Sequence, residues 1–217
     1  MTGIEHDQAT SGRPVGTLRA NQKEATRRRL MDAAMAVFAE KGYGAATVND
    51  IAREAGTSSA TFYLHFKRKI DVLTESIEEE ARQVWFVSAP VFSAEEPLTL
   101  ESLRTWSEQL FDYWQDLRVS HQALGQAVLI EPELKVEQTR RLSEGIEFWE
   151  NFLKKLGVRA GARRRAEAAL LNAQIFGLFE MWIVHRIPLD AGALVEVTAA
   201  SLWQRLSSLE RSPEKTH

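Results

Sequence analysis

The sequence predicts an all-α protein with a small helical domain at its N-terminal end and a larger helical domain after it. Apolar residues recur at helical spacing from Thr26 to Leu209, and no alternating pattern long enough for a strand interrupts them. Hydrophobic residues make up 44% of the 217 residues and charged residues 26%, which is typical of a folded globular chain. The charge is uneven, because residues 1–69 carry a net charge of +4 and the remainder −7. This asymmetry is typical of a protein with one end facing a polyanion.

Several classes of chemistry are excluded by the composition and motifs. The chain has no Cys, which excludes disulfides, thiolate metal sites and cysteine nucleophiles. There is no Walker A sequence, and the five His residues form no i, i+4 pair, so we expect no metal site, no cofactor and no enzymatic activity. The glycine-containing runs that begin at Gly42 and Gly56 resemble a dinucleotide fingerprint and a nucleophile elbow, but neither follows a strand.

The sequence also indicates a cytoplasmic protein without a membrane span. The N-terminal residues contain no apolar signal segment. No run of about 18 consecutive apolar residues occurs, because polar residues interrupt the most apolar stretch, residues 166–184.

The first helices are delimited by strong local signals. Residues 1–24 are predicted to be a flexible basic arm, with an inert tail as the alternative. Residues 26–41 follow a helical stripe that Gly42 ends. Thr47 can cap the next helix, and Asp50 completes a variant of the capping box.

A second turn and a short third helix follow, which gives residues 25–69 the pattern of a helix-turn-helix domain. Gly56 ends the second helix, and Ser58 caps a third helix that extends to about Leu64. Phe62 and Phe66 lie one helical turn apart and are expected to face the core. The opposite side is small and polar, so it could enter a DNA major groove.

At these residues the sequence resembles the DNA-binding domain of the tetracycline-repressor (TetR) family of bacterial regulators. The matching features are FAEKGYGAATV, IAREAG and the pattern S-x-x-T-F-Y-x-H-F-x-x-K that ends at Lys69. Thr57 departs from the family pattern, which has an aliphatic residue in the turn. The resemblance implies a homodimer that reads a palindromic operator in double-stranded DNA.

The resemblance also implies which residues contact DNA. Thr47, Tyr63, His65 and Lys69 match phosphate-contacting positions, although Thr47 could serve only as a helix cap. The predicted DNA-binding residues are Thr47, Asn49, Ser58, Ser59, Ala60, Thr61, Tyr63, His65 and Lys69.

Residues 70–211 are predicted to form a helical effector-binding and dimerisation domain, and residues 212–217 a frayed tail. Pro90 and Pro97 bracket a break, after which helices are expected over residues 100–119, 121–130, 133–156, 163–186 and 192–209. The run Glu75, Glu78, Glu79 and Glu80 is interpreted as a solvated acidic face, with a cation site as the alternative.

All six Trp residues lie in this second domain, and so many wide, flat side chains are difficult to pack without a void. The family resemblance implies a pocket here for a small apolar or aromatic effector. Asn172 and Gln174 need a polar partner, either in the core or on the ligand. The predicted lining residues are Trp85, Trp106, Phe111, Trp114, His121, Gln126, Phe148, Phe152, Asn172, Phe176 and Phe179.

The last two helices carry the predicted dimer interface, with packing inside one chain as the alternative. The final helix has an apolar stripe of Val195, Ala199, Leu202, Trp203, Leu206 and Leu209, and the preceding helix has small residues at Ala169, Ala173 and Gly177, followed by Met181. The expected function is a ligand-responsive DNA-binding regulator, most often a repressor. The alternatives are a small-molecule-binding protein or enzyme with a vestigial helix-turn-helix, and a DNA-binding protein with a filled core.

Overall fold

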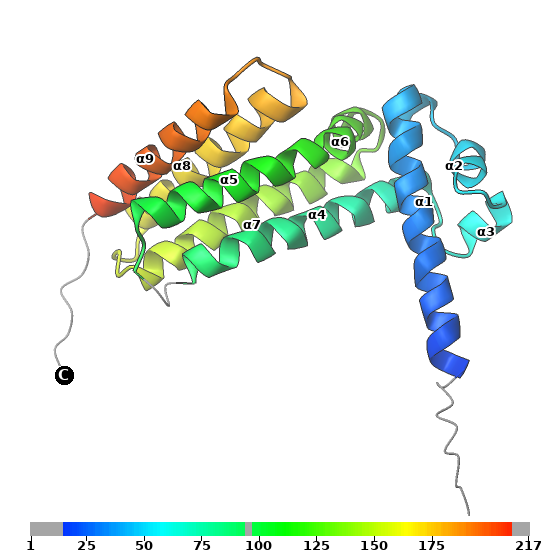
Figure 1. Cartoon of the computed structure of the whole chain (residues 1–217), viewed down its shortest axis with the longest axis horizontal. Coiled ribbons are helices and arrows are strands. Elements are labelled where there is room, and N and C mark those ends of the chain that lie inside the picture. The colour runs from blue at the N-terminus through cyan, green and yellow to red at the C-terminus, as the bar shows by residue number, and fades with distance from the viewer. Residues whose placement is uncertain (1–14, 94–96, 210–217) are drawn as a thin grey trace, which may run out of the picture.

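A computed structural model describes residues 15–93 and 97–209, and these residues form an elongated, all-helical molecule without strands (Figure 1). The helices α1 to α3 lie at one end, and a long bundle extends from them. Within the described residues the α-helices are α1 (Val15–Ala45), α2 (Val48–Glu54), α3 (Ser59–Tyr63), α4 (Lys69–Phe92), α5 (Leu100–Asp116), α6 (Arg118–Ile130), α7 (Glu133–Lys155), α8 (Ala162–Phe179) and α9 (Ala191–Ser207).

The predicted start and end signals of the first helices are confirmed. At Gly42 the backbone φ is +75°, and beyond it the chain turns toward α2. Thr47 and Asp50 form the capping box of α2, and the Ser58 hydroxyl accepts a hydrogen bond from the Thr61 amide at the start of α3.

One predicted boundary was wrong, and the predicted break between Pro90 and Pro97 begins two residues past Pro90. Residues 15–24, assigned to a flexible arm, are the first turns of α1, while residues 1–14 of that arm and the predicted tail at 212–217 lie outside the described residues. Pro90 does not break α4, which continues to Phe92. Pro90 lacks the N–H that would bond to the Phe86 carbonyl, and the helix continues for only two residues beyond it.

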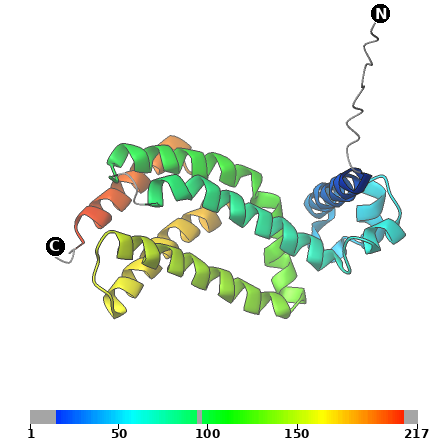
Figure 2. The same cartoon turned by 90° about the horizontal axis from the view of Figure 1, so that it is seen from below.

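The molecule has two hydrophobic cores, and the N-terminal core extends past the predicted boundary at residue 69. Phe62 and Phe66 are buried there with α1, as predicted, but the same core includes Ile70 and Leu73 of α4 and Ala127 of α6. The helix α6 therefore packs directly on α1, and α4 runs from one core into the other (Figure 2). The N-terminal end is thereby joined to the bundle by two helices.

The C-terminal core lies between α5, α7, α8 and α9, with α7 packed on α8 and α5 on α9. Most of the predicted dimer stripe on α9 is buried against this core, with Leu202 at 0% and Leu206 at 1% exposure. Of the stripe residues only Trp203 is exposed. The alternative of packing within one chain therefore applies to the rest of the stripe.

One helical stretch of the described chain, Ala162–Val184, is long and apolar enough to cross a membrane by those two criteria alone. It joins α8 to a π-helical turn, Glu180–Val184. Within it Glu167 is buried and paired with Arg205 of α9, and one side of α8 packs on α7. These features are those of a bundle helix, so the stretch is weak support for a membrane span.

Candidate functional site

The N-terminal end presents α3 on the outside of the molecule with its polar face exposed (Figure 1). Phe62 is fully buried, and its ring centroid lies 5.7 Å from that of Phe66, which fixes α3 on the core. Tyr63, the next residue, is 58% exposed. Ala60 is exposed as well, so the face that points away from the core has the small and polar character that the sequence predicts.

Hydrogen bonds hold the polar residues of this face in place. The Ser59 hydroxyl donates to Asn49 Oδ1 at 2.5 Å and so ties α3 to α2. Ser58 and Thr61 share a hydrogen bond of 3.0 Å. These contacts bring five predicted residues, Asn49, Ser58, Ser59, Ala60 and Thr61, to one surface together with Tyr63.

Thr47 lies at the start of α2 next to a charged cluster. Its hydroxyl accepts from the Asp50 amide, and its own amide donates to Asp50 Oδ2 at 3.2 Å. Lys41 and Arg53 bond to Asp50 at 2.7 and 2.6 Å. The Lys41 and Thr47 hydrogen bonds hold the pKa of Asp50 well below its usual range, so the cap remains ionised. The Thr47 hydroxyl also donates to Asp50 Oδ2 at 2.7 Å, and the residue as a whole is exposed.

Two predicted phosphate-contacting residues are placed differently from the expectation. Lys69 Nζ does not point outward: it donates to the carbonyls of Tyr43 at 2.6 Å and Ala46 at 2.9 Å, and it lies 4.3 Å from the Tyr43 ring. Burial lowers the pKa of Lys69. Its ammonium closes the turn after α1, because the carbonyls of that turn have no helical partner.

His65 is half-buried, and its Nδ1 has no hydrogen-bond partner in the described chain. Burial and the nearby Arg27 lower the pKa of His65, so the ring is neutral at pH 7. Arg27 donates to the His65 carbonyl at 2.6 Å and pairs with Glu75 of α4. The imidazole therefore lies beside a bracing network between α1, α3 and α4.

Exposed side chains that sequence reasoning did not assign lie next to this surface. Leu64 is 77% exposed at the C-terminal end of α3, and Lys67 is exposed after it. The exposure of Leu64 could have been predicted from the sequence, because Phe62 and Phe66 define the inward face and Leu64 lies between them in the chain.

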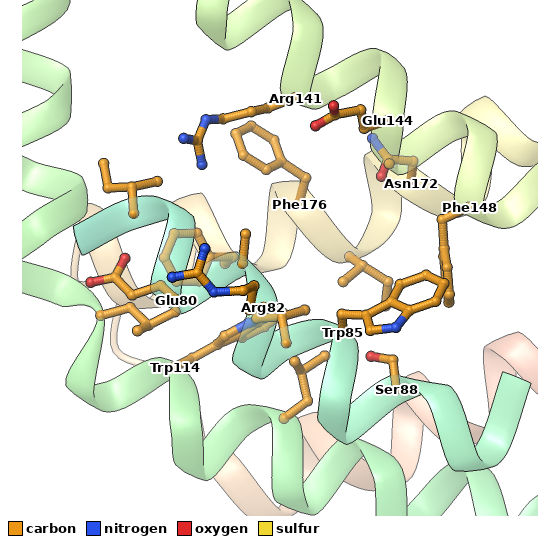
Figure 3. A pocket seen from close by; sticks show the side chains of 18 of the residues that line it. Glu80, Arg82, Trp85, Ser88, Trp114, Arg141, Glu144, Phe148, Asn172 and Phe176 are labelled. Atoms are coloured by element: carbon orange, nitrogen blue, oxygen red, sulfur yellow. The ribbon is translucent and has the colours of Figure 1, made fainter. Parts of the chain in front are cut away.

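The bundle contains a cavity of about 940 Å³ between α4, α5, α6, α7 and α8 (Figure 3). Eight of the eleven predicted lining residues are found on its wall: Trp85, Trp106, Trp114, His121, Phe148, Asn172, Phe176 and Phe179. Trp106 donates from Nε1 to the Ser88 hydroxyl at 3.0 Å, which fixes that wall. Asn172 lies against Gly145, where a Cβ would be 2.3 Å from Asn172 Oδ1, so α7 and α8 approach closely there.

Three predicted lining residues are not part of the cavity wall. Phe111 is buried in the core and stacks on Trp114 at 4.8 Å, and Phe152 is buried against Phe92 at 4.9 Å. Gln126 Oε1 accepts from the Tyr43 amide at 2.7 Å and so connects α6 to the turn after α1. Phe111 and Phe152 therefore fill the core as ordinary apolar groups, and the Gln126 side chain has a partner within the chain.

The cavity also has charged residues that the sequence interpretation missed. Glu80 is not on a solvated acidic face, because its side chain is only 17% exposed and lines the cavity. His121 Nε2 lies 3.6 Å from Glu80 Oε2. Arg141 and Glu144 line the cavity from α7 (Figure 3).

Gln174 does not line the cavity, and its side-chain amide donates to the Ser201 hydroxyl at 3.2 Å. In the described part of the chain, no group of three or more acidic or His residues is placed to hold a metal ion.

The N-terminal end of the chain matches a known protein family. Residues 30–75 match the family described as bacterial regulatory proteins, tetR family. The fatty acid metabolism regulator protein of Bacillus subtilis (strain 168) is 40% identical over 62 residues, which is 29% of this chain and 32% of that protein. The chain thus matches about a third of that relative's length, and its similarity to the relative is confined to this part.

Solved structures extend the likeness to the whole fold. A tetR-family transcriptional regulator from Mesorhizobium loti matches with a TM-score of 0.67 and 19% identity, over 86% of this chain and 97% of that one. SmeT, the repressor of the Stenotrophomonas maltophilia multidrug efflux pump SmeDEF, matches with a TM-score of 0.65 and 22% identity, over 88% and 93%. SmeT has also been solved as a complex with triclosan. At these identities the likeness shows the fold.

Proposed function

Since the chain belongs, through residues 30–75, to the tetracycline-repressor family of bacterial regulatory proteins, we propose that it is a ligand-responsive transcriptional regulator. In this proposal a homodimer binds a palindromic operator in the cytoplasm through the surface formed by α2 and α3. A small apolar or aromatic effector enters the cavity and releases the DNA. The mode is repression relieved by the effector.

The exposed face of α3 is the observation that carries this proposal. A short helix fixed by Phe62 and Phe66 presents Ser59, Ala60 and Tyr63 to the outside. Small residues allow the backbone to approach base edges in a major groove, and a tyrosine can contact a phosphate or a base methyl group. Thr47 adds an exposed residue at the adjacent helix start. The exposed Lys67 supplies a phosphate contact in place of Lys69, because the Lys69 ammonium is bonded to the Tyr43 and Ala46 carbonyls.

The outer faces of α8 and α9 supply the proposed dimer interface. The two helices are joined by the hydrogen bond between Gln174 and Ser201. Apolar residues remain exposed on both of them, including Leu170 at 60% and Val197 at 66%, and Met181 of the π-helical turn after α8 is 47% exposed. Small residues beside them, such as Ala173, permit close approach of a second copy.

The link between cavity and DNA surface is short. The helices α4 and α6 line the cavity and also contribute to the N-terminal core. Gln126 bonds to Tyr43, and Arg68 pairs with Glu133 of α7 at 2.8 Å. A ligand that favours a different position of α4 or α6 would shift α3, and it acts only through its differential affinity for the two states.

Selection of bound duplexes from a random DNA pool tests the proposal. We expect enrichment of an inverted repeat, with half-sites spaced by helical turns, and at least two chains on each bound duplex. The affinity should fall steeply with salt, because several phosphates are neutralised. A chain that is monomeric in solution, or a pool without an enriched sequence, would contradict the proposal.

A further inference from the structure

We propose that the cavity takes a lipophilic monocation, with the Glu80 carboxylate as its counter-ion. This inference rests on the proposed function, because it names the chemical class of the effector. It follows from three features of the cavity: a buried acid with one carboxyl oxygen that lacks a hydrogen-bond partner, arginines that already have partners, and aromatic walls.

The first feature is the Glu80 carboxyl. Glu80 Oε2 is buried and has no hydrogen-bond partner among the described residues. The nearest basic group is His121, whose Nε2 lies 3.6 Å away and makes no hydrogen bond to the carboxyl. A buried polar atom without a partner is costly, and a bound ligand that supplies one recovers that cost.

The second feature is that the arginines on the cavity wall already have acidic partners. Arg82 pairs with Glu79, and Arg141 donates from Nε to Glu137 Oε1 at 2.9 Å. Arg140 pairs with both Glu137 and Glu144. The positive charges near the opening are therefore balanced, whereas neither Glu78 nor Glu80, which both line the cavity, has an arginine partner within 4 Å in the described chain. This pattern favours a cation over a carboxylate or phosphate ligand.

The third feature is the aromatic wall. Trp114 and Phe179 contact each other at 5.2 Å, and Phe179 lies 4.4 Å from His121, so these rings surround the end of the cavity near Glu80. Trp85 and Phe148 contact each other at 5.3 Å further along the wall. Aromatic faces attract cations and also bury apolar substituents. A cation with apolar or aromatic groups matches both properties.

Titration of Glu80 gives the inference a pH signature. Burial raises the pKa of Glu80 to about 7, and burial lowers the pKa of His121 to about 4, so the imidazole stays neutral. Other groups that face Glu80 are Ser120 of α6, Arg141 of α7 and Tyr113 of α5, whose hydroxyl bonds to the Glu80 carbonyl. Below pH 7 the carboxyl is protonated and neutral. A cation prefers the ionised form, so its affinity should rise from pH 6 to pH 8, with release of a proton on binding.

Two ions of the same shape and opposite charge test the inference: tetraphenylphosphonium and tetraphenylborate. Binding is measured by calorimetry and by quenching of tryptophan fluorescence, since Trp85 and Trp114 line the cavity. We expect the native protein to bind the phosphonium at least about tenfold more tightly than the borate. Glu80→Gln should weaken phosphonium binding by about tenfold and abolish its pH dependence. The matched control is Glu147→Gln, because Glu147 is an exposed acid on α7 outside the cavity. This variant should change neither the affinity for the phosphonium nor its pH dependence.

The other outcomes separate the two proposals. Equal or tighter binding of the borate, or unchanged phosphonium binding by a folded Glu80→Gln, overturns the assignment of the ligand class but leaves a ligand-binding cavity. If neither ion binds, the effector part of the proposed function fails as well. If Glu80→Gln does not fold, the comparison of the two ions and the pH profile of the native chain still decide the result.

Discussion

The two ends of the molecule treat their polar side chains in opposite ways. On the proposed DNA-binding surface most polar side chains are bonded to each other, as in the pair Ser59 and Asn49 and in the cap formed by Thr47 and Asp50. In the bundle cavity the Glu80 carboxyl lacks a hydrogen-bond partner for one oxygen among the described residues. A preorganised surface can meet a regular partner such as duplex DNA, whereas an unpaired group in a cavity needs a ligand to complete it.

The largest effects are expected at two neighbours in α3 that separate folding from recognition. Phe62→Ala removes a fully buried ring and should lower the free energy of unfolding by about 3–5 kcal/mol. Tyr63→Ala should change the free energy of unfolding by no more than about 0.5 kcal/mol and should weaken operator binding by about 1–3 kcal/mol. Urea denaturation and fluorescence anisotropy with a labelled operator measure the two quantities. Full operator affinity in Tyr63→Ala would remove this residue from the surface.

A smaller effect distinguishes two lysines at the start of α4. Lys69→Met leaves carbonyls of the turn after α1 without their donor, so the free energy of unfolding should fall by about 1–3 kcal/mol. Lys67→Met should leave stability within about 0.5 kcal/mol and reduce the salt dependence of operator binding by about one phosphate contact. Urea denaturation measures the stability of both variants, and fluorescence anisotropy at several salt concentrations measures the salt dependence of their operator binding. A reversed pattern would restore Lys69 as the phosphate contact.

The N-terminal end was largely predictable because its signals are local. A capping residue and its partner lie three positions apart, as in Thr47 and Asp50, and Gly42 marks a helix end by its backbone alone. The inward pair Phe62 and Phe66 defines α3 by helical spacing. Lys69 was misplaced because its partners are carbonyls more than twenty residues away, and His65 was misplaced because it lies beside the Arg27 and Glu75 pair of α1 and α4.

The cavity was less predictable because its wall depends on helices distant in the sequence. Phe111 and Trp114 lie one turn apart on α5, yet only Trp114 lines the cavity. Composition indicates that aromatic residues gather in the second domain, but it does not tell which of them face a void. Glu80 was assigned to a solvated acidic run for the same reason, since its burial results from packing against α6.

Coupling between the two ends is the central claim, and the affinity of tetraphenylphosphonium for operator-bound protein tests it most directly. The dissociation constant is measured for the free protein and for protein saturated with its selected operator. We expect weaker binding to the operator complex, by the same factor by which the phosphonium weakens operator binding, because linkage between two sites is reciprocal. Equal dissociation constants in the two states would contradict the account.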